Sequence, residues 1–276
     1  MTAIELPNGS AVPADPRRER VRATWSAGDV GRIATSHAGG AAAFVARLDL
    51  EPGAHVLDVA CGTGNLAIPA SRAGAVVVGL DIVPALLAQA RAAAAAEGLG
   101  ARFDEGDCEE MPYEDASFDV AMSMAGAMFA ARPERAAAEL LRVVRPGGRI
   151  AMANWTSRGF VGEMGRLTAA YAPPPADVPS PLLWGDETTV RARLAGVASL
   201  RLVRRHAVLE FPFGPSAVVE ELRAWYGPTV REFAALDAPA RDALRRALEA
   251  LWAGHNRATD GTTRVESEYL DVLAIR

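Results

Sequence analysis

Strand-like and helix-like segments alternate along the middle of the chain, and this alternation constrains the fold more than any other feature. The apolar run 54–60 is followed by helical spacing at 64–73. Strands joined by helical crossovers form a mostly parallel sheet covered on both faces. The sequence therefore predicts a Rossmann-like α/β fold. Further strands are predicted at 75–81, 101–106, 117–124 and 149–154, and further helices at 84–97 and 133–144, both opened by proline.

Changes in composition divide the chain into four parts. Residues 1–24 are polar, which predicts a loosely ordered N-terminal tail. Residues 25–154 carry the alternating pattern and form the cofactor-binding α/β core. Residues 155–199 contain a Pro-rich stretch and four large aromatic residues, which predicts an inserted helical lid next to the substrate. Residues 200–276 complete the sheet. Outside the core we expect helices at 39–48, 160–171, 187–194 and, as a pair, within 216–254, and strands at 200–211 and 264–275.

The charge balance limits the partners of the chain. Its net charge is −5, whereas nucleic-acid binders usually carry a basic excess or stripe. We interpret the arginine cluster at 17–22 as a solvated face. No apolar run reaches the length of a membrane span. We therefore expect a cytoplasmic protein that acts on a small molecule, without a nucleic-acid or membrane partner, and we leave its oligomeric state open.

The chain contains no lysine, since all 29 basic residues are arginines. This excludes Schiff-base enzymes, Walker-type phosphate loops and dehydrogenases whose proton relay uses a tyrosine–lysine pair. The two cysteines, Cys61 and Cys108, lack the spacing of a metal or redox pair. We expect both to be small buried residues in a reducing compartment.

The turn after the first predicted strand carries the strongest functional signal. Gly62 and Gly64 let the backbone approach a ligand closely, and the following helix offers free N–H groups. In open α/β sheets, ligands bind beyond the carboxyl ends of the strands. This turn alone also fits a dinucleotide site, because residues 62–67 satisfy the pattern Gly-x-Gly-x-x-Ala.

Three carboxylates favour a different ligand. Asp58 lies inside the first strand, Asp81 ends the second, and Asp107 follows the third. Asp81 occupies the place expected for a carboxylate that accepts hydrogen bonds from ribose hydroxyls. A dinucleotide would bring a pyrophosphate close to Asp58, whereas the sulfonium of S-adenosylmethionine carries a positive charge and no phosphate. Asp58 therefore indicates S-adenosylmethionine as the cofactor.

The segment from Asp58 to Gly64, followed by Asp81 and Asp107, resembles the class I S-adenosylmethionine-dependent methyltransferases. Ala60 stands where a glycine is commoner. The turn 145–149 resembles the one before their fifth strand. The chain is most similar to the ubiquinone- and menaquinone-biosynthesis group, which acts on small molecules, and the resemblance covers residues 25–154.

The resemblance implies a cofactor site and a role for several of its residues. Asp81 would bind the ribose, and Asp107 would accept from the adenine amino group. Trp25 belongs to a segment that often closes over the cofactor. The implied cofactor-binding residues are Trp25, Asp58, Ala60, Gly62, Gly64, Asn65, Asp81, Ile82, Asp107, Cys108, Ser123 and Met124.

The substrate side of the site is less defined. We expect Phe129, Trp155, Phe160, Tyr171 and Trp184 to line a substrate pocket. His37 is the one histidine that we consider as a general base. None of the four histidines has metal-ligand spacing with another, so we expect no metal.

Two other functions remain open at this point. An NAD(P)-dependent oxidoreductase on a Rossmann sheet would explain Gly62, Gly64 and Asp81, but not Asp58. An S-adenosylmethionine-binding protein with chemistry other than methyl transfer would explain all four residues. A protein-interaction module has the least support, because the three carboxylates at ligand positions would then be coincidental.

Overall fold

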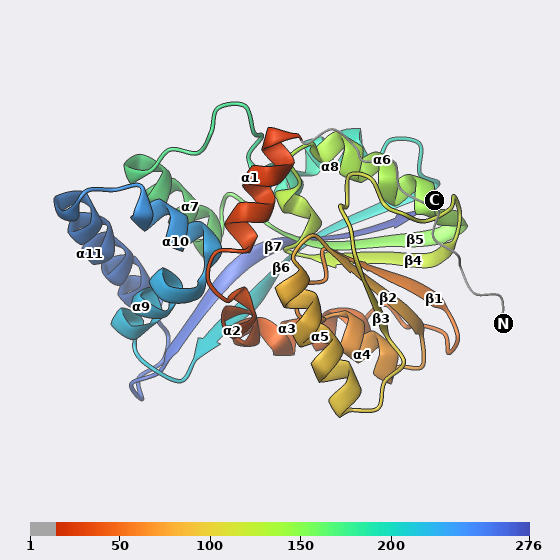
Figure 1. The fold of residues 1–276 in the computed structure, drawn as a ribbon, viewed down its shortest axis with the longest axis horizontal. Helices are drawn as coiled ribbons and strands as arrows, with labels where there is room; N and C mark the ends of the chain where they lie inside the picture. The colour runs from red at the N-terminus through yellow and green to blue at the C-terminus, as the bar shows by residue number, and fades with distance from the viewer. Residues whose placement is uncertain (1–14) are drawn as a thin grey trace.

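A seven-stranded sheet forms the centre of the computed structural model, which describes residues 15–276 except for the side chain of His37 (Figure 1). The strand order is β3-β2-β1-β4-β5-β7-β6. The first five strands are parallel, and β7 pairs antiparallel with both β5 and β6. This confirms the predicted fold class. The strands are β1 (His55–Val59), β2 (Val76–Asp81), β3 (Arg102–Glu105), β4 (Phe118–Met124), β5 (Val144–Trp155), β6 (Ser199–Phe211) and β7 (Thr263–Ile275).

Strand β5 begins five residues earlier than predicted. Phe118 of β4 pairs with Val144, but Val120 pairs with Arg149, so the turn 145–148 is accommodated as an irregularity within the strand. Gly147 adopts a φ of +78°, which is why a glycine is needed there.

Helices cover both faces of the sheet. On one face, α3 (Ala38–Ala46), α4 (Ala67–Arg72) and α5 (Pro84–Ala96) pack on side chains such as Val56. On the other face, α6 (Pro133–Val143), the 3-10 helix η3 (Pro181–Gly185) and α8 (Glu187–Arg193) pack on side chains such as Leu57. Because successive strand residues point to opposite faces, these neighbours belong to two separate cores.

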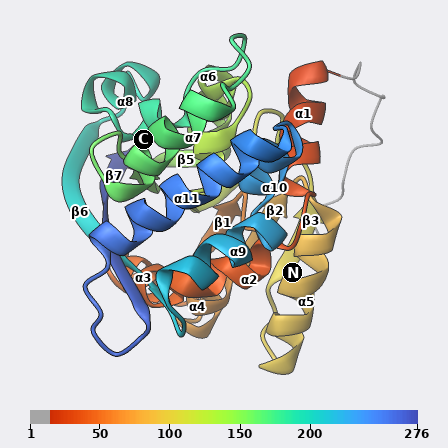
Figure 2. The ribbon, with the colours of Figure 1, turned by 90° about the vertical axis from the view of Figure 1, so that its left-hand side faces the viewer.

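A third core joins four helices beside the sheet. These are α7 (Phe160–Tyr171), α9 (Pro215–Trp225), α10 (Gly227–Ala234) and α11 (Ala238–His255), and Figure 2 views this group from the front. The sequence predicted two helices in the C-terminal part of the group, whereas the structure has three. One break falls at Gly227, where a Cβ would lie 2.0 Å from the carbonyl oxygen of Thr24. The other falls at Asp237, whose carboxylate caps α11.

The structure differs from the predicted division of the chain in two places. Residues 155–199 do not form one lid, because α7 belongs to the helical group while η3 and α8 pack on the sheet. The predicted tail contains a helix, α1 (Pro16–Trp25), since Asp15 accepts a hydrogen bond from the Arg17 amide and Pro16 occupies the first turn. Residues 1–14 of that tail lie outside the described part of the chain.

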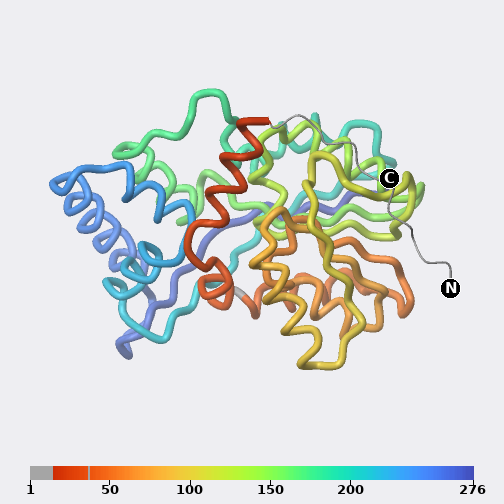
Figure 3. The backbone as a smooth tube through the Cα atoms, in the orientation of Figure 1, coloured from red at the N-terminus to blue at the C-terminus, as the bar shows by residue number. Residues whose placement is uncertain are grey.

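Helix α1 crosses the middle of the molecule, between the helical group and the α/β core (Figures 1 and 3). Its carboxyl end continues into α2 (Val30–Ala34) and the 3-10 helix η1 (Thr35–His37). These segments reach the carboxyl ends of the parallel strands. Among residues 15–276, no helix combines the length and hydrophobicity needed to cross a bilayer.

Candidate active site

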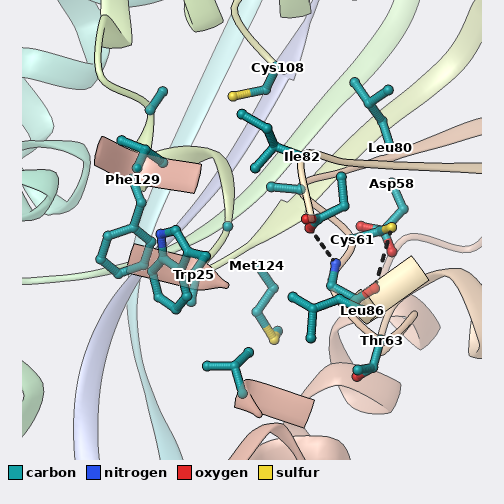
Figure 4. Close-up of a pocket in the computed structure, with 18 of the residues that line it drawn as sticks. Trp25, Asp58, Cys61, Thr63, Leu80, Ile82, Leu86, Cys108, Met124 and Phe129 are labelled. Atoms are coloured by element: carbon teal, nitrogen blue, oxygen red, sulfur yellow. Dashed lines mark hydrogen bonds between the residues drawn. The ribbon is translucent and has the colours of Figure 1, made fainter. Parts of the chain in front are cut away.

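A cavity of about 190 Å³ lies at the carboxyl ends of β1, β2 and β4, beneath α1 and α2. In Figure 4 the rings of Trp25 and Phe129 lie on one side of it and Asp58 and Cys61 on the other. The cavity brings together residues that are far apart in the sequence. The predicted residues that line it are Trp25, Asp58, Ala60, Gly62, Asn65, Asp81, Ile82, Asp107, Cys108, Met124, Phe129 and Trp155.

The turn after β1 is held by Asp81. One of its carboxylate oxygens accepts from the Gly62 amide at 2.8 Å and the other from the Val83 amide at 2.9 Å. Gly62 adopts a φ of +54°, which suits glycine, but Ala60 has a similar φ of +55° and bears a Cβ. Through its two hydrogen bonds Asp81 fixes the loop that lines the cavity, and it also forms part of the cavity wall.

Asp58 is almost completely buried, with 1% of its surface exposed. Its carboxylate accepts from the Ala67 amide at 2.9 Å, at the first turn of α4. Burial, together with the neighbouring Asp81 carboxylate, raises the pKa of Asp58 to about 8. Burial also raises the pKa of Asp81. Two adjacent carboxylates with raised pKa values favour a ligand that brings positive charge and hydroxyl donors.

Asp107 makes an ion pair that sequence reasoning missed. Its carboxylate contacts the guanidinium of Arg18 from α1 and also accepts from the Glu109 amide at 2.8 Å. Arg18 bonds Glu110 as well, at 3.2 Å. The interpretation of this arginine as part of a solvated face is wrong, because 16% of its side chain is exposed and it lines the cavity. The Asp15-Pro16 pair was the available signal, since a cap followed by proline predicts a helix start.

Aromatic rings close the cavity on the side away from Asp58. Trp25 packs edge-on against Phe129 at a centroid distance of 4.7 Å and against Tyr226 at 5.9 Å. Tyr226 joins α9 to α10 and lines the cavity, so the C-terminal part of the chain contributes to the site. No local sequence signal distinguishes Tyr226 from a core residue.

Other predicted site residues do not line this cavity. Ser123 is buried, donates to the Val59 carbonyl at 2.7 Å and accepts from the Ala127 amide at 2.9 Å, so it braces the strand ends. Gly64 has a φ of +86° and shapes the turn. Phe160, Tyr171 and Trp184 also lie elsewhere, in the third core or against the sheet.

The three aromatic residues are explained by packing. Phe160 lies edge-on to Trp252 at 4.5 Å, and Trp184 is fully buried beneath the guanidinium of Arg193. Tyr171 is half-buried against the helical group. The backbone of His37 belongs to η1, but its side chain lies outside the described part of the structure, so its candidacy as a base stays a prediction.

Nucleophilic and metal chemistry find little support in residues 15–276. Cys61 and Cys108 are free, and burial raises the pKa of each thiol well above its usual value, which keeps both sulfurs neutral. No group of three or more His, Cys, Asp or Glu side chains in the described region is placed to hold a metal ion.

Comparison with known proteins identifies the family. Residues 57–152, from β1 to β5, match the family model described as a methyltransferase domain. The chain is 35% identical over 173 residues to the demethylmenaquinone methyltransferase of Deinococcus radiodurans, covering 61% of this chain and 66% of that one. The chain belongs to the class I S-adenosylmethionine-dependent methyltransferases.

Further similarities extend over more of this methyltransferase. It is 38% identical over 216 residues to an uncharacterized protein of Mycobacterium tuberculosis, covering 77% of this chain and 79% of that protein. The crystal structure of the YcgJ protein from Bacillus subtilis has the same fold, with a TM-score of 0.57 at 17% identity, covering 87% of this chain and 99% of that chain. The matched family favours methyl transfer over the oxidoreductase alternative.

Proposed function

We propose that the main cavity binds S-adenosylmethionine through the residues around Asp58 and Asp81, and that the methyl acceptor is a small molecule. The pair of buried carboxylates beside a glycine turn carries this proposal. A dinucleotide would bring a pyrophosphate to the same turn, where two carboxylates disfavour further negative charge.

The residues present fit the cofactor. Asp81 keeps lone pairs beyond those used by the Gly62 and Val83 amides, and a carboxylate accepts about four hydrogen bonds, which leaves room for the ribose hydroxyls. Ile82 and Leu86 offer apolar surface to the adenine ring. A nearby positive charge lowers the pKa of a carboxyl, so Asp58 would ionise when the sulfonium binds and would balance its charge from within the turn. When bound, the cofactor supplies an electrophilic methyl group on a sulfonium, and the protein acts by positioning and by excluding water.

Several features support a small acceptor. The cavity is lined by α1 and by the rings of Trp25, Phe129 and Tyr226, and its volume of about 190 Å³ suits small ligands. The net charge of −5 disfavours nucleic acid. The Deinococcus relative is named for methylation of demethylmenaquinone, a small molecule. The two free cysteines support a reducing compartment, and we propose the cytoplasm.

The proposal is tested with S-adenosylmethionine labelled on its methyl carbon. Purified protein is incubated with the cofactor and a cell extract, and the products are separated by size. We expect label in the low-molecular-weight fraction, and much less with Asp81→Asn. Asp119→Asn is a matched control, because Asp119 also holds a backbone amide, that of His55, but at the opposite end of the sheet. Label in protein or nucleic acid would contradict the proposed acceptor class.

A further inference from the structure

A second cavity, of about 100 Å³, adjoins the main one. It lies between α3 and the antiparallel strands β6 and β7. Met124, Ala125 and Trp155 line both cavities, so the two spaces share a wall at the carboxyl ends of β4 and β5. A molecule in the second cavity would therefore lie next to a ligand bound in the main one.

Apart from Arg47, His206 and the Tyr269 hydroxyl, the walls of this second cavity are apolar and mostly small. Gly40 and Ala43 contribute from α3, and Ala153 and Ala207 contribute from the sheet. The ring of Trp155 meets that of Tyr269 edge-on at 6.5 Å. An engineered apolar cavity of about 150 Å³ holds a benzene molecule. The second cavity is smaller, at about 100 Å³, so a planar ring seated in it would extend past Met124 and Trp155 towards the main cavity.

One end of the second cavity carries positive charge. Arg47 donates to the Tyr269 hydroxyl at 3.1 Å and lies 3.5 Å from the Asp271 carboxylate. Asp271 is bound more closely by Arg205, at 2.5 Å. Within the described part of the chain, Asp271 is the one carboxylate that pairs with Arg47, so two guanidinium groups share a single negative charge. This excess favours an anion beside Arg47.

We propose that the second cavity binds the methyl acceptor, and that the acceptor is a planar compound whose oxyanion, a carboxylate or a phenolate, is held by Arg47 and Tyr269. This inference rests on the proposed function, in which S-adenosylmethionine occupies the main cavity. Met124 and Trp155 then lie at the boundary where the two ligands meet.

The anion is tested with 4-fluorobenzoate, titrated into the ligand-free protein and followed by fluorine NMR. We expect binding in the millimolar range, weakened about tenfold or more by Arg47→Gln, because a hydrogen bond to a charged group contributes roughly 1.5–3 kcal/mol. Asp271→Asn should strengthen binding, since it removes the competing carboxylate. The neutral 4-fluorobenzamide should bind at least about tenfold more weakly than the acid. Equal binding of the two probes, or unchanged binding to Arg47→Gln, would overturn the proposal.

The location of the proposed acceptor site is tested with substitutions at two glycines of α3. A Cβ at either Gly39 or Gly40 would meet no atom within 4 Å, but only Gly40 lines the second cavity. We expect Gly40→Leu to abolish binding of 4-fluorobenzoate and Gly39→Leu to preserve it, with S-adenosylhomocysteine bound equally by both variants. Binding that survives Gly40→Leu would overturn the assigned location. Failure of the wild-type protein to bind S-adenosylhomocysteine would instead overturn the proposed function, and with it the acceptor role of this cavity.

Discussion

The guanidinium of Arg18 lies against the carboxylate of Asp107, so helix α1 contacts the group expected to recognise adenine. Both side chains are largely buried, and Arg18 also bonds Glu110. A ligand whose adenine amino group donates to Asp107 must share this carboxylate with Arg18. In the proposed cofactor site, helix α1 therefore competes with the ligand for one of the acceptors.

We expect Arg18→Gln to strengthen the binding of S-adenosylhomocysteine about threefold, because the ligand then gains a hydrogen bond to Asp107 without competition, and one hydrogen bond contributes about 0.5–1.5 kcal/mol. Isothermal calorimetry measures the change. Arg17→Gln is the control. Arg17 lies on the same helix as Arg18, but it pairs with the exposed Asp177 instead of Asp107. A marked loss of affinity in Arg18→Gln would show that Arg18 contacts the ligand rather than competing with it.

Salt should loosen helix α1. The helix buries none of its residues fully and is held by ion pairs such as those of Arg18 with Asp107 and Arg22 with Glu105. Screening lengths fall from about 10 Å at 0.1 M salt to about 3 Å at 1 M. We expect amide hydrogen exchange in α1 to accelerate over this range, while α11, anchored by the buried Leu244 and Trp252, changes little. Equal effects on both helices would argue against this attachment.

The raised pKa of Asp58 makes stability depend on pH. Its value of about 8 in the folded protein exceeds the ordinary value of about 3.9. The protonated carboxyl therefore contributes stability that is complete below about pH 4 and is lost as the pH rises through about 8. Relative to Asp58→Asn, the free energy of unfolding of the wild type should fall by up to about 1.4 kcal/mol per pH unit between these limits. Urea unfolding at several pH values measures the free energy of unfolding of both proteins. The same dependence of this free energy on pH in both would contradict the account.

Ala60 offers a test of backbone strain. Its φ of +55° lies in the left-handed region, which costs a residue with a Cβ about 1–2 kcal/mol. Because glycine also loses more entropy on folding, we expect Ala60→Gly to stabilise the protein by about 0.5–1 kcal/mol and to raise Tm by about 2 °C. Calorimetric melting measures both. A lower Tm would mean that contacts of the Ala60 methyl group outweigh the strain.

The parts of this structure that are local in the chain could be predicted from the sequence. The strands, the helix starts at Pro84 and Pro133, and the loop that carries Gly62 follow from spacing and turn chemistry. Asp58 and Asp81 could be placed beside each other because parallel strands end at the same edge of a sheet.

The parts that depend on long-range packing could not be predicted. Nothing near Tyr226 in the sequence indicates that α10 brings it to Trp25. Phe160 and Trp184 were expected at the substrate, but an aromatic side chain serves a core as readily as a pocket. Arg47 drew no attention because its significance depends on Tyr269, which lies 222 residues away.

The most direct test of the cofactor assignment is a calorimetric titration of the purified protein with S-adenosylhomocysteine and, separately, with NAD. We predict that S-adenosylhomocysteine binds with a stoichiometry of about one and that Asp81→Asn weakens this binding about tenfold or more, since hydrogen bonds to a charged group are lost. NAD should not bind. Binding of NAD alone would contradict the account and would indicate that the glycine turn binds a dinucleotide.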